Sequence, residues 1–338
     1  MAKLKRKAIF QATLIYLDEP QLIFLKAKGV NVIAVAVPSD DAGQARFLAV
    51  TATPRNFESY MEGNTDLRFL FTFPRQRSLY YFDLMKMVGG EVTMLPHEGP
   101  VPEADLPSPR LFSSEHTEEF ELPPRAEDEQ KLIIDGEWDM PEFGSFYGQY
   151  ADIYYFVAAT KKWEDPAHDP GRKANIAATF RDKPYQGGSS YKHFYNELIY
   201  QAPRDERAGL ESIAYASPGI VKLSGKEELF DEVRELVDHY LDNRGLAVKA
   251  YQDLYNYLSR AKLLTLSGDR FQADNPAAAF IGAQTQTLSD AMNFPSLAAV
   301  KELVGGNALV AAKLLLSLFR RVEEASTYFA QGRMTYTD

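Results

Sequence analysis

The chain has 338 residues, which is enough for about two domains. Hydrophobic residues make up 45% and charged residues 25%, and this composition excludes a largely disordered, collagenous or fibrous chain. The formal net charge is −10, and the lack of cysteine excludes disulfides, thiol catalysis, iron–sulfur clusters and cysteine zinc sites.

Residues 1–97 are predicted to form a small α+β domain around a curved antiparallel sheet. Short runs rich in Ile, Val, Leu and Phe alternate with turn signals, which is typical of strands joined in a meander. Lys28-Gly29 is predicted to form a tight hairpin turn. Residues 54–61 are predicted to form a short helix that begins at proline and is stopped by the following Gly63. The predicted strands are 8–16, 22–28, 30–37, 47–51, 78–85 and 91–95.

Residues 98–130 are predicted to be an acidic, proline-rich linker. Between Glu98 and Glu129, ten acidic residues stand against Arg110 and Arg125 alone. Like charges repel and proline opposes regular structure, so this composition favours an open chain. The alternative is an acidic strap that covers a basic groove in a partner or in the protein itself. A general nucleic-acid binder is not expected, because phosphate contacts need clustered Lys and Arg.

Residues 131–338 are predicted to form a mainly helical domain. Ser224-Gly225-Lys226-Glu227 matches a capping box that begins one helix, and Gly245 lies just past the end of that helix. Another helix is predicted ahead of the turn Ser217-Pro218-Gly219. Gly305-Gly306-Asn307 is predicted to hinge the last two helices. The remaining predicted helices are 145–158, 189–200, 247–266, 297–304 and 308–329.

One segment of this domain is a candidate ligand site. A double glycine allows close approach of a ligand to the backbone, and the helix that follows offers free N–H groups to an anion. Lysine and histidine side chains add positive charge. The alternative is purely structural, with a turn at Gly-Gly, a serine N-cap and core tyrosines. The candidate residues are Lys183, Tyr185, Gly187, Gly188, Ser189, Ser190, Tyr191, Lys192 and His193.

No catalytic residue, metal site or cofactor is predicted. The phosphate-loop, dinucleotide-binding, zinc-protease and nucleophile-elbow motifs are missing from the sequence. His116, flanked by acidic residues, is interpreted as a surface residue rather than a cation ligand. The longest apolar runs fall short of the roughly 20 residues of a membrane span, and no signal-peptide pattern is found, so a cytoplasmic protein is expected.

The last predicted helix carries an apolar stripe that is a candidate interface. One interpretation docks this stripe on the helices at 226–266 of the same chain, and the other lets it meet its copy or a partner protein. Lys313, Ser317 and Arg320 are assigned to the polar surface of the helix. The stripe consists of Ala311, Leu315, Leu318, Val322, Ala325 and Phe329.

Four short motifs resemble a family of uncharacterised bacterial proteins of unknown function that open with Tyr-Asp-x-Pro. They are Tyr16-Leu17-Asp18-Glu19-Pro20, Asp66-Leu67-Arg68 after the short helix, Phe194-Tyr195-Asn196-Glu197-Leu198 and Ser217-Pro218-Gly219. Leu17 between Tyr16 and Asp18 departs from the family pattern. The resemblance covers about residues 8–95 and 145–225, and it implies a bacterial cytosolic origin without an activity.

Two functions follow as hypotheses. The first is a non-catalytic binding or adaptor protein that acts through contacts with a protein partner or with its own copy. The alternative is a sensor or enzyme for an anionic small molecule, either a phosphorylated metabolite or a nucleotide, bound at the Gly187-Gly188 helix N-terminus.

Overall fold

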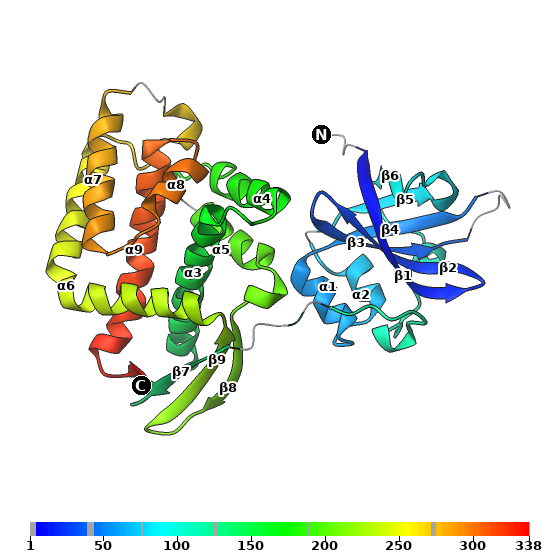
Figure 1. The fold of residues 1–338 in the computed structure, drawn as a ribbon, viewed down its shortest axis with the longest axis horizontal. Coiled ribbons are helices and arrows are strands. Elements are labelled where there is room, and N and C mark those ends of the chain that lie inside the picture. The colour runs from blue at the N-terminus through cyan, green and yellow to red at the C-terminus, as the bar shows by residue number, and fades with distance from the viewer. Residues whose placement is uncertain are drawn as a thin grey trace. The chain divides into compact units, whose positions relative to one another are not determined.

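The chain folds into two compact units, residues 1–123 and residues 124–338 (Figure 1). We call them the barrel unit and the helical unit. The predicted α+β class is confirmed, because an antiparallel sheet is followed by a mainly helical region. The computed structural model describes residues 5–38, 44–75, 77–122, 124, 128–187, 190–271 and 275–337.

The barrel unit is built on six antiparallel strands that close on themselves, since β1 pairs with β6 as well as with β2. The predicted curved sheet is therefore a closed barrel. Its strands are β1 (Arg6–Leu17), β2 (Glu19–Ala27), β3 (Val30–Ala36), β4 (Arg46–Ala52), β5 (Leu79–Asp83) and β6 (Glu91–His97). Its helices are α1 (Pro54–Met61), α2 (Leu67–Thr72) and the 3₁₀ turns η1 (Leu84–Lys86), η2 (Glu103–Asp105) and η3 (Ser113–Glu115).

Strands β2, β3 and β4 read as nearly continuous apolar runs because both of their faces are largely buried. Ile23 and Leu25 belong to one cluster of buried side chains, while Leu22 and Phe24 belong to a second cluster that contains the core residues of α1 and α2. Successive side chains of a strand point to opposite faces, so the first cluster fills the barrel and the second lies under the helices. The apolar side chains of both clusters are therefore largely shielded from solvent.

Local turn chemistry accounts for the connections of the barrel unit. Lys28 and Gly29 have φ values of 50° and 78°, and positive φ at both positions is what a tight hairpin requires. The predicted hairpin is therefore confirmed. Helix α1 begins at Pro54 as predicted, where the Thr53 hydroxyl accepts the Asn56 N–H at 3.2 Å.

Residues 98–122 wrap around the barrel unit and are not the open linker that their composition predicts. The Leu111 carbonyl accepts the Leu67 N–H at 2.7 Å, and the Leu14 carbonyl accepts the Thr117 N–H at 3.1 Å. Phe120 packs edge-on against Phe24 in the second cluster. We call residues 98–122 the acidic strap.

Acidic side chains of the strap pair with cations of the barrel. Arg68 Nη2 donates to both carboxylate oxygens of Glu103, at 2.7 and 2.8 Å. The buried Asp105 accepts the Tyr81 hydroxyl at 2.5 Å and lies 3.6 Å from Arg46. These pairs offset the repulsion on which the linker prediction rests. The strap of the alternative interpretation is therefore present, although it pairs with single arginines of the same protein and not with a basic groove.

The predicted domain limits at 97 and 131 change accordingly. The division falls between residues 123 and 124. Of the remaining linker residues, 123 and 125–127 lie outside the described residues, and 128–130 belong to strand β7.

The helical unit packs its last helix, α9, against α3, α6 and α7, beside a sheet of order β10-β7-β9-β8. Within the described ranges, no helix is long and apolar enough to cross a membrane. The helices of the helical unit are α3 (Met140–Glu164), α4 (Pro170–Arg181), α5 (Ser190–Gln201), η4 (Arg204–Glu206), α6 (Glu227–Arg260), η5 (Gly268–Arg270), α7 (Ala277–Ala291), α8 (Leu297–Leu303) and α9 (Ala308–Ala330). Its strands are β7 (Asp128–Ile134), β8 (Gly209–Ala214), β9 (Gly219–Gly225) and β10 (Met334–Tyr336).

Three local predictions in the helical unit are wrong. The segment before Ser217 is strand β8 and not a helix, because it pairs along β9. Ser224 belongs to β9, so no capping box forms, and α6 has Lys226 as its N-cap. Helix α6 also continues past Gly245 with a kink at Asn243, since buried apolar residues recur as far as Leu258.

The apolar stripe of α9 lies in the core of the helical unit. Ala311, Leu315, Leu318, Val322 and Ala325 are all buried in one cluster with side chains of α3, α6 and α7. Phe329 is half-buried and stacks on Tyr336 with ring centroids 4.8 Å apart. The stripe therefore docks inside the same chain, and its residues are not free to form the interface of the second interpretation.

Candidate functional site

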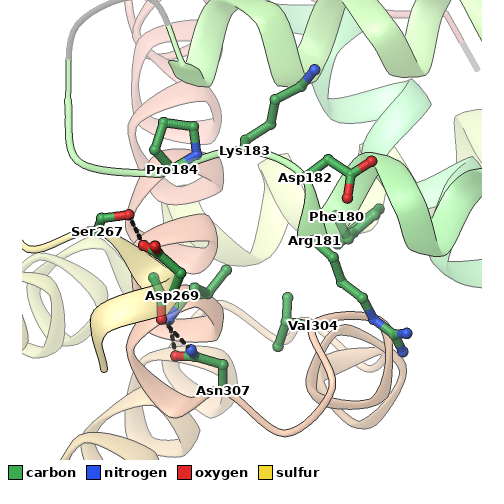
Figure 2. Close-up of a pocket in the computed structure, with 11 residues that line it drawn as sticks. Phe180, Arg181, Asp182, Lys183, Pro184, Ser267, Asp269, Val304 and Asn307 are labelled. Atoms are coloured by element: carbon green, nitrogen blue, oxygen red, sulfur yellow. Dashed lines mark hydrogen bonds between the residues drawn. The ribbon is translucent and has the colours of Figure 1, made fainter. Parts of the chain in front are cut away.

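A cavity of about 420 Å³ opens in the helical unit between the end of α4, the η5 turn and the start of α9 (Figure 2). Arg181 and Lys183 extend from one wall in different directions, and Asp269 and Asn307 lie on the opposite side. Apolar side chains line the cavity together with these polar groups. The lining residues are Phe180, Arg181, Asp182, Lys183, Pro184, Ser267, Gly268, Asp269, Val304, Asn307 and Val310.

The turn between α8 and α9 is held to the other walls by polar contacts. Arg181 Nε donates to the Leu303 carbonyl at 2.8 Å. Asn307 caps α9 by accepting the Val310 N–H at 3.1 Å, and its side-chain amide donates to the Gly268 carbonyl at 2.8 Å. Gly305 and Gly306 have φ values of 65° and 79°, and they make the turn between the two helices where the hinge is predicted.

A buried lysine joins the two loops that carry the lining residues Pro184 and Gly268. Lys313, on α9, is 1% exposed, and its Nζ donates to the carbonyls of Tyr185 and Leu266 at 2.6 Å each. The Gly268 N–H donates to the Pro184 carbonyl at 3.1 Å in the same place. Burial lowers the pKa of Lys313 to about 8. The lysine predicted at the helix surface is therefore a buried cation at neutral pH.

The structure separates the residues of the predicted ligand site. Only Lys183 lines the cavity. Tyr185 is fully buried and its hydroxyl donates to the Thr179 carbonyl at 3.1 Å, so its ring belongs to the core. Gly187 has a φ of 106°, which serves the turn.

The other members of that set lie on or before α5. The Ser190 hydroxyl donates to the Gly187 carbonyl at 2.8 Å, and Tyr191 is half-buried. Lys192 and His193 are exposed, and neither lines the cavity. Gly188 and Ser189 lie outside the described residues. The described residues therefore do not gather into an anion site at the α5 N-terminus.

Sequence reasoning missed Arg181, Asp269, Asn307 and Lys313. The first three come from segments far apart in the sequence, and no local pattern connects them. Lys313 did carry a signal, because it is the one charged residue in an otherwise apolar run from Leu309 to Leu316. A lone cation in such a run faces the core whenever the helix is covered on every side.

Among the residues that the structure places, no group of three histidine, aspartate or glutamate side chains could hold a metal ion. His116 is half-buried rather than at the surface, and its Nε2 lies 2.8 Å from the Tyr60 hydroxyl. Burial lowers the pKa of His116, which favours the neutral ring that can accept this hydrogen bond. The histidine thus fastens the acidic strap to α1.

No protein-family model matches this chain, and no curated protein or solved structure matches it. The resemblance to uncharacterised bacterial proteins therefore stays a prediction.

Proposed function

We propose that the chain is a non-catalytic binding protein that acts through protein–protein contacts in the cytoplasm, with the edge of β8 as its contact surface. The supporting observation is the apolar exposure of the β8–β9 hairpin. Leu210, Ile213 and Ile220 are each 43% exposed, and Tyr215 is 57% exposed. Exposed apolar groups on an edge strand favour pairing with another strand.

Strand β8 has the backbone needed for such pairing. It is the last strand in the order β10-β7-β9-β8, so one of its edges faces away from the sheet. Within the described part of the chain, no strand pairs with that outer edge. Its free N–H and C=O groups can accept an added strand.

The occupant that we propose is β8 of a second copy, in antiparallel pairing centred on Ile213. Ile213 shares the face of its partner, the buried Val221, while Ser212 and Ala214 share the opposite face with Lys222 and Ile220. A two-fold axis at Ile213 places the two isoleucines opposite each other and Ser212 opposite Ala214 of the copy. Side chains of the same face therefore meet.

Charge is compatible with this pairing. Glu211 is the one charged residue of β8. Glu211 lies at the register shift between Leu210 and Ser212, and a two-fold axis at Ile213 places the two copies of Glu211 on opposite sides of that axis. Like charges consequently do not oppose each other across the two strands.

Replacing Ile213 with lysine is expected to prevent self-association, because two ammonium groups would then face each other at the two-fold axis. We expect sedimentation velocity to find a dimer for the unmodified protein and a monomer for Ile213→Lys, with unchanged melting. Leu246→Lys is the matched control, since Leu246 is 65% exposed on α6. A monomeric unmodified protein at every concentration, or a dimer that survives Ile213→Lys, contradicts the proposal.

A further inference from the structure

A row of exposed side chains crosses the wall of the barrel unit where β6 begins. Glu91 forms a bridge with Val88 on one side and pairs with Ile9 of β1 on the other. Ile9 in turn pairs with Lys26 of β2. Residues that pair across antiparallel strands share one face of the sheet, and the buried Ala8, next to Ile9, belongs to the cluster that fills the barrel. The four residues of the row therefore face outward.

The apolar side chains of this surface lie largely in water. Val88 is 79% exposed and Ile9 is 56% exposed. Met85, in the η1 turn shortly before Val88, is 72% exposed. Large apolar groups that gather in water lack the stabilisation that burial gives, and such patches mark interaction sites. A partner that covers these side chains is therefore expected.

Lysines surround the apolar side chains. Lys26 belongs to the row, and Lys28 lies at the hairpin turn that follows it. Lys7 shares its face of β1 with Ile9, and Lys86 belongs to η1. All four lysines are exposed. We call the three apolar side chains and these four lysines the β1–β6 patch.

Positive charge exceeds negative charge at the β1–β6 patch. Glu91 accepts a hydrogen bond from Lys7 Nζ at 2.7 Å, and a carboxylate oxygen of Asp83 lies 3.5 Å from Lys86 Nζ. Four lysines against these two carboxylates leave two positive charges, although the whole chain carries a net charge of −10. The patch therefore attracts an anionic partner that the rest of the chain tends to repel.

The composition of the patch favours a lipid bilayer over a protein as this partner. The centres of protein interfaces are enriched in aromatic residues and arginine and depleted in lysine, whereas the patch has four lysines and neither arginine nor an aromatic residue. Lysine suits a bilayer surface, because its aliphatic stem lies along apolar groups while its ammonium reaches the charged headgroups. Apolar side chains in the interfacial layer and cations against anionic lipids together stabilise peripheral binding.

We propose that the β1–β6 patch binds the surface of an anionic lipid bilayer. Its apolar side chains lie among the headgroups, and its lysines contact the anionic groups of the lipids. The attachment is peripheral and uses the barrel unit alone, so it is independent of the β8 contact in the helical unit.

Co-sedimentation of the full chain with lipid vesicles tests the proposal. One set of vesicles contains phosphatidylcholine alone, and the other contains phosphatidylserine as one third of the lipid. We expect about thirtyfold tighter binding to the phosphatidylserine vesicles, because each of the two excess charges contributes about fivefold near an anionic surface. High salt is expected to remove this preference by screening. A chain that binds neither kind of vesicle, or both kinds equally, overturns the proposal.

Lys26→Glu together with Lys86→Glu is expected to abolish binding to the phosphatidylserine vesicles, because the patch then carries an excess of negative charge. Lys192→Glu together with Lys249→Glu is the matched control. It changes the net charge by the same amount, and both lysines are exposed on helices of the helical unit. The control should bind like the unmodified chain. An equal loss in both variants overturns the proposal, since net charge and not the patch would then control binding.

A fluorophore at position 88 tests whether the patch itself enters the headgroup layer. The chain has no cysteine, so Val88→Cys provides a single attachment point for an environment-sensitive dye. On phosphatidylserine vesicles its emission is expected to shift to shorter wavelength, because water is excluded from the dye. Leu17→Cys is the matched control, since Leu17 is 62% exposed at the other end of β1, beside Asp18 and Glu19. Equal shifts at both positions, or no shift at position 88, overturn the proposal.

Discussion

Replacing Leu315 with glutamate is expected to unfold the helical unit and to leave the barrel unit folded. Leu315 is fully buried on α9 in the cluster that joins α9 to α3, α6 and α7. Loss of the apolar side chain together with burial of a carboxylate costs at least about 4 kcal/mol, which is comparable with the whole stability of many domains. Circular dichroism during heating should show the helical transition lost and the barrel transition kept.

Leu246→Glu is the control for this experiment, because the same chemical change falls on a side chain that is 65% exposed on α6. It should melt like the unmodified protein. If Leu315→Glu instead kept a folded helical unit and only lowered the mass in solution, the α9 stripe would be an interface between chains and not a core.

The double substitution of Leu111 and Phe120 by serine is expected to destabilise the barrel unit by roughly 4 kcal/mol, because apolar side chains that cover the second barrel cluster are removed. Phe120 contacts the rings of Phe24 and Phe57, with centroids 5.3 and 6.3 Å away. The melting transition of the barrel unit should move down, and the strap should become open to proteases.

Replacing Glu118 and Glu119 with serine is the matched control, since both glutamate side chains are exposed on the same strap. This variant should leave barrel melting unchanged. Two results together would restore the open-linker interpretation. Proteases would cut the unmodified protein at once within residues 98–122, and the double substitution of Leu111 and Phe120 would leave the melting of the barrel unit unchanged.

The parts of the fold that local chemistry determines were predictable from the sequence. The Lys28-Gly29 hairpin needs two positive φ values, and Pro54 suits a helix start because the N–H that proline lacks would have no partner within the helix there. Both depend on a few neighbouring residues. The apolar runs of β2, β3 and β4 likewise reflect burial on both faces, although periodicity alone does not reveal that the sheet closes.

The features that the sequence did not predict depend on contacts between distant segments. The composition of the strap predicts an open chain. In the structure, however, Glu103 accepts a hydrogen bond from Arg68 and Asp105 accepts one from Tyr81, and both donors belong to the domain that the linker interpretation treats as separate. Strand β8 forms because β9 lies beside it. Lys313 is buried because α9 is covered on every side from Ala311 to Phe319, whereas the sequence assigned Lys313 to the polar surface of the helix.

The candidate site was predicted only at its edge. Lys183 belongs to both the predicted set and the cavity, while Tyr185 takes a core position and Lys192 and His193 point elsewhere on α5. A double glycine before a helix is a local pattern. The cavity is made by the end of α4, the η5 turn and the start of α9, and only the folded chain brings these together.

Cross-linking through a single introduced cysteine tests the β8 contact most directly, because the chain has no cysteine of its own. Residues that oppose each other across antiparallel strands have Cβ atoms about 4.5–5.5 Å apart, close to the range that a disulfide bridges. Under mild oxidation, Ile213→Cys is expected to form a disulfide-linked dimer rapidly, whereas Leu246→Cys remains monomeric. A reduced, monomeric Ile213→Cys, or a linked dimer that forms no faster than that of Leu246→Cys, would contradict pairing between β8 strands.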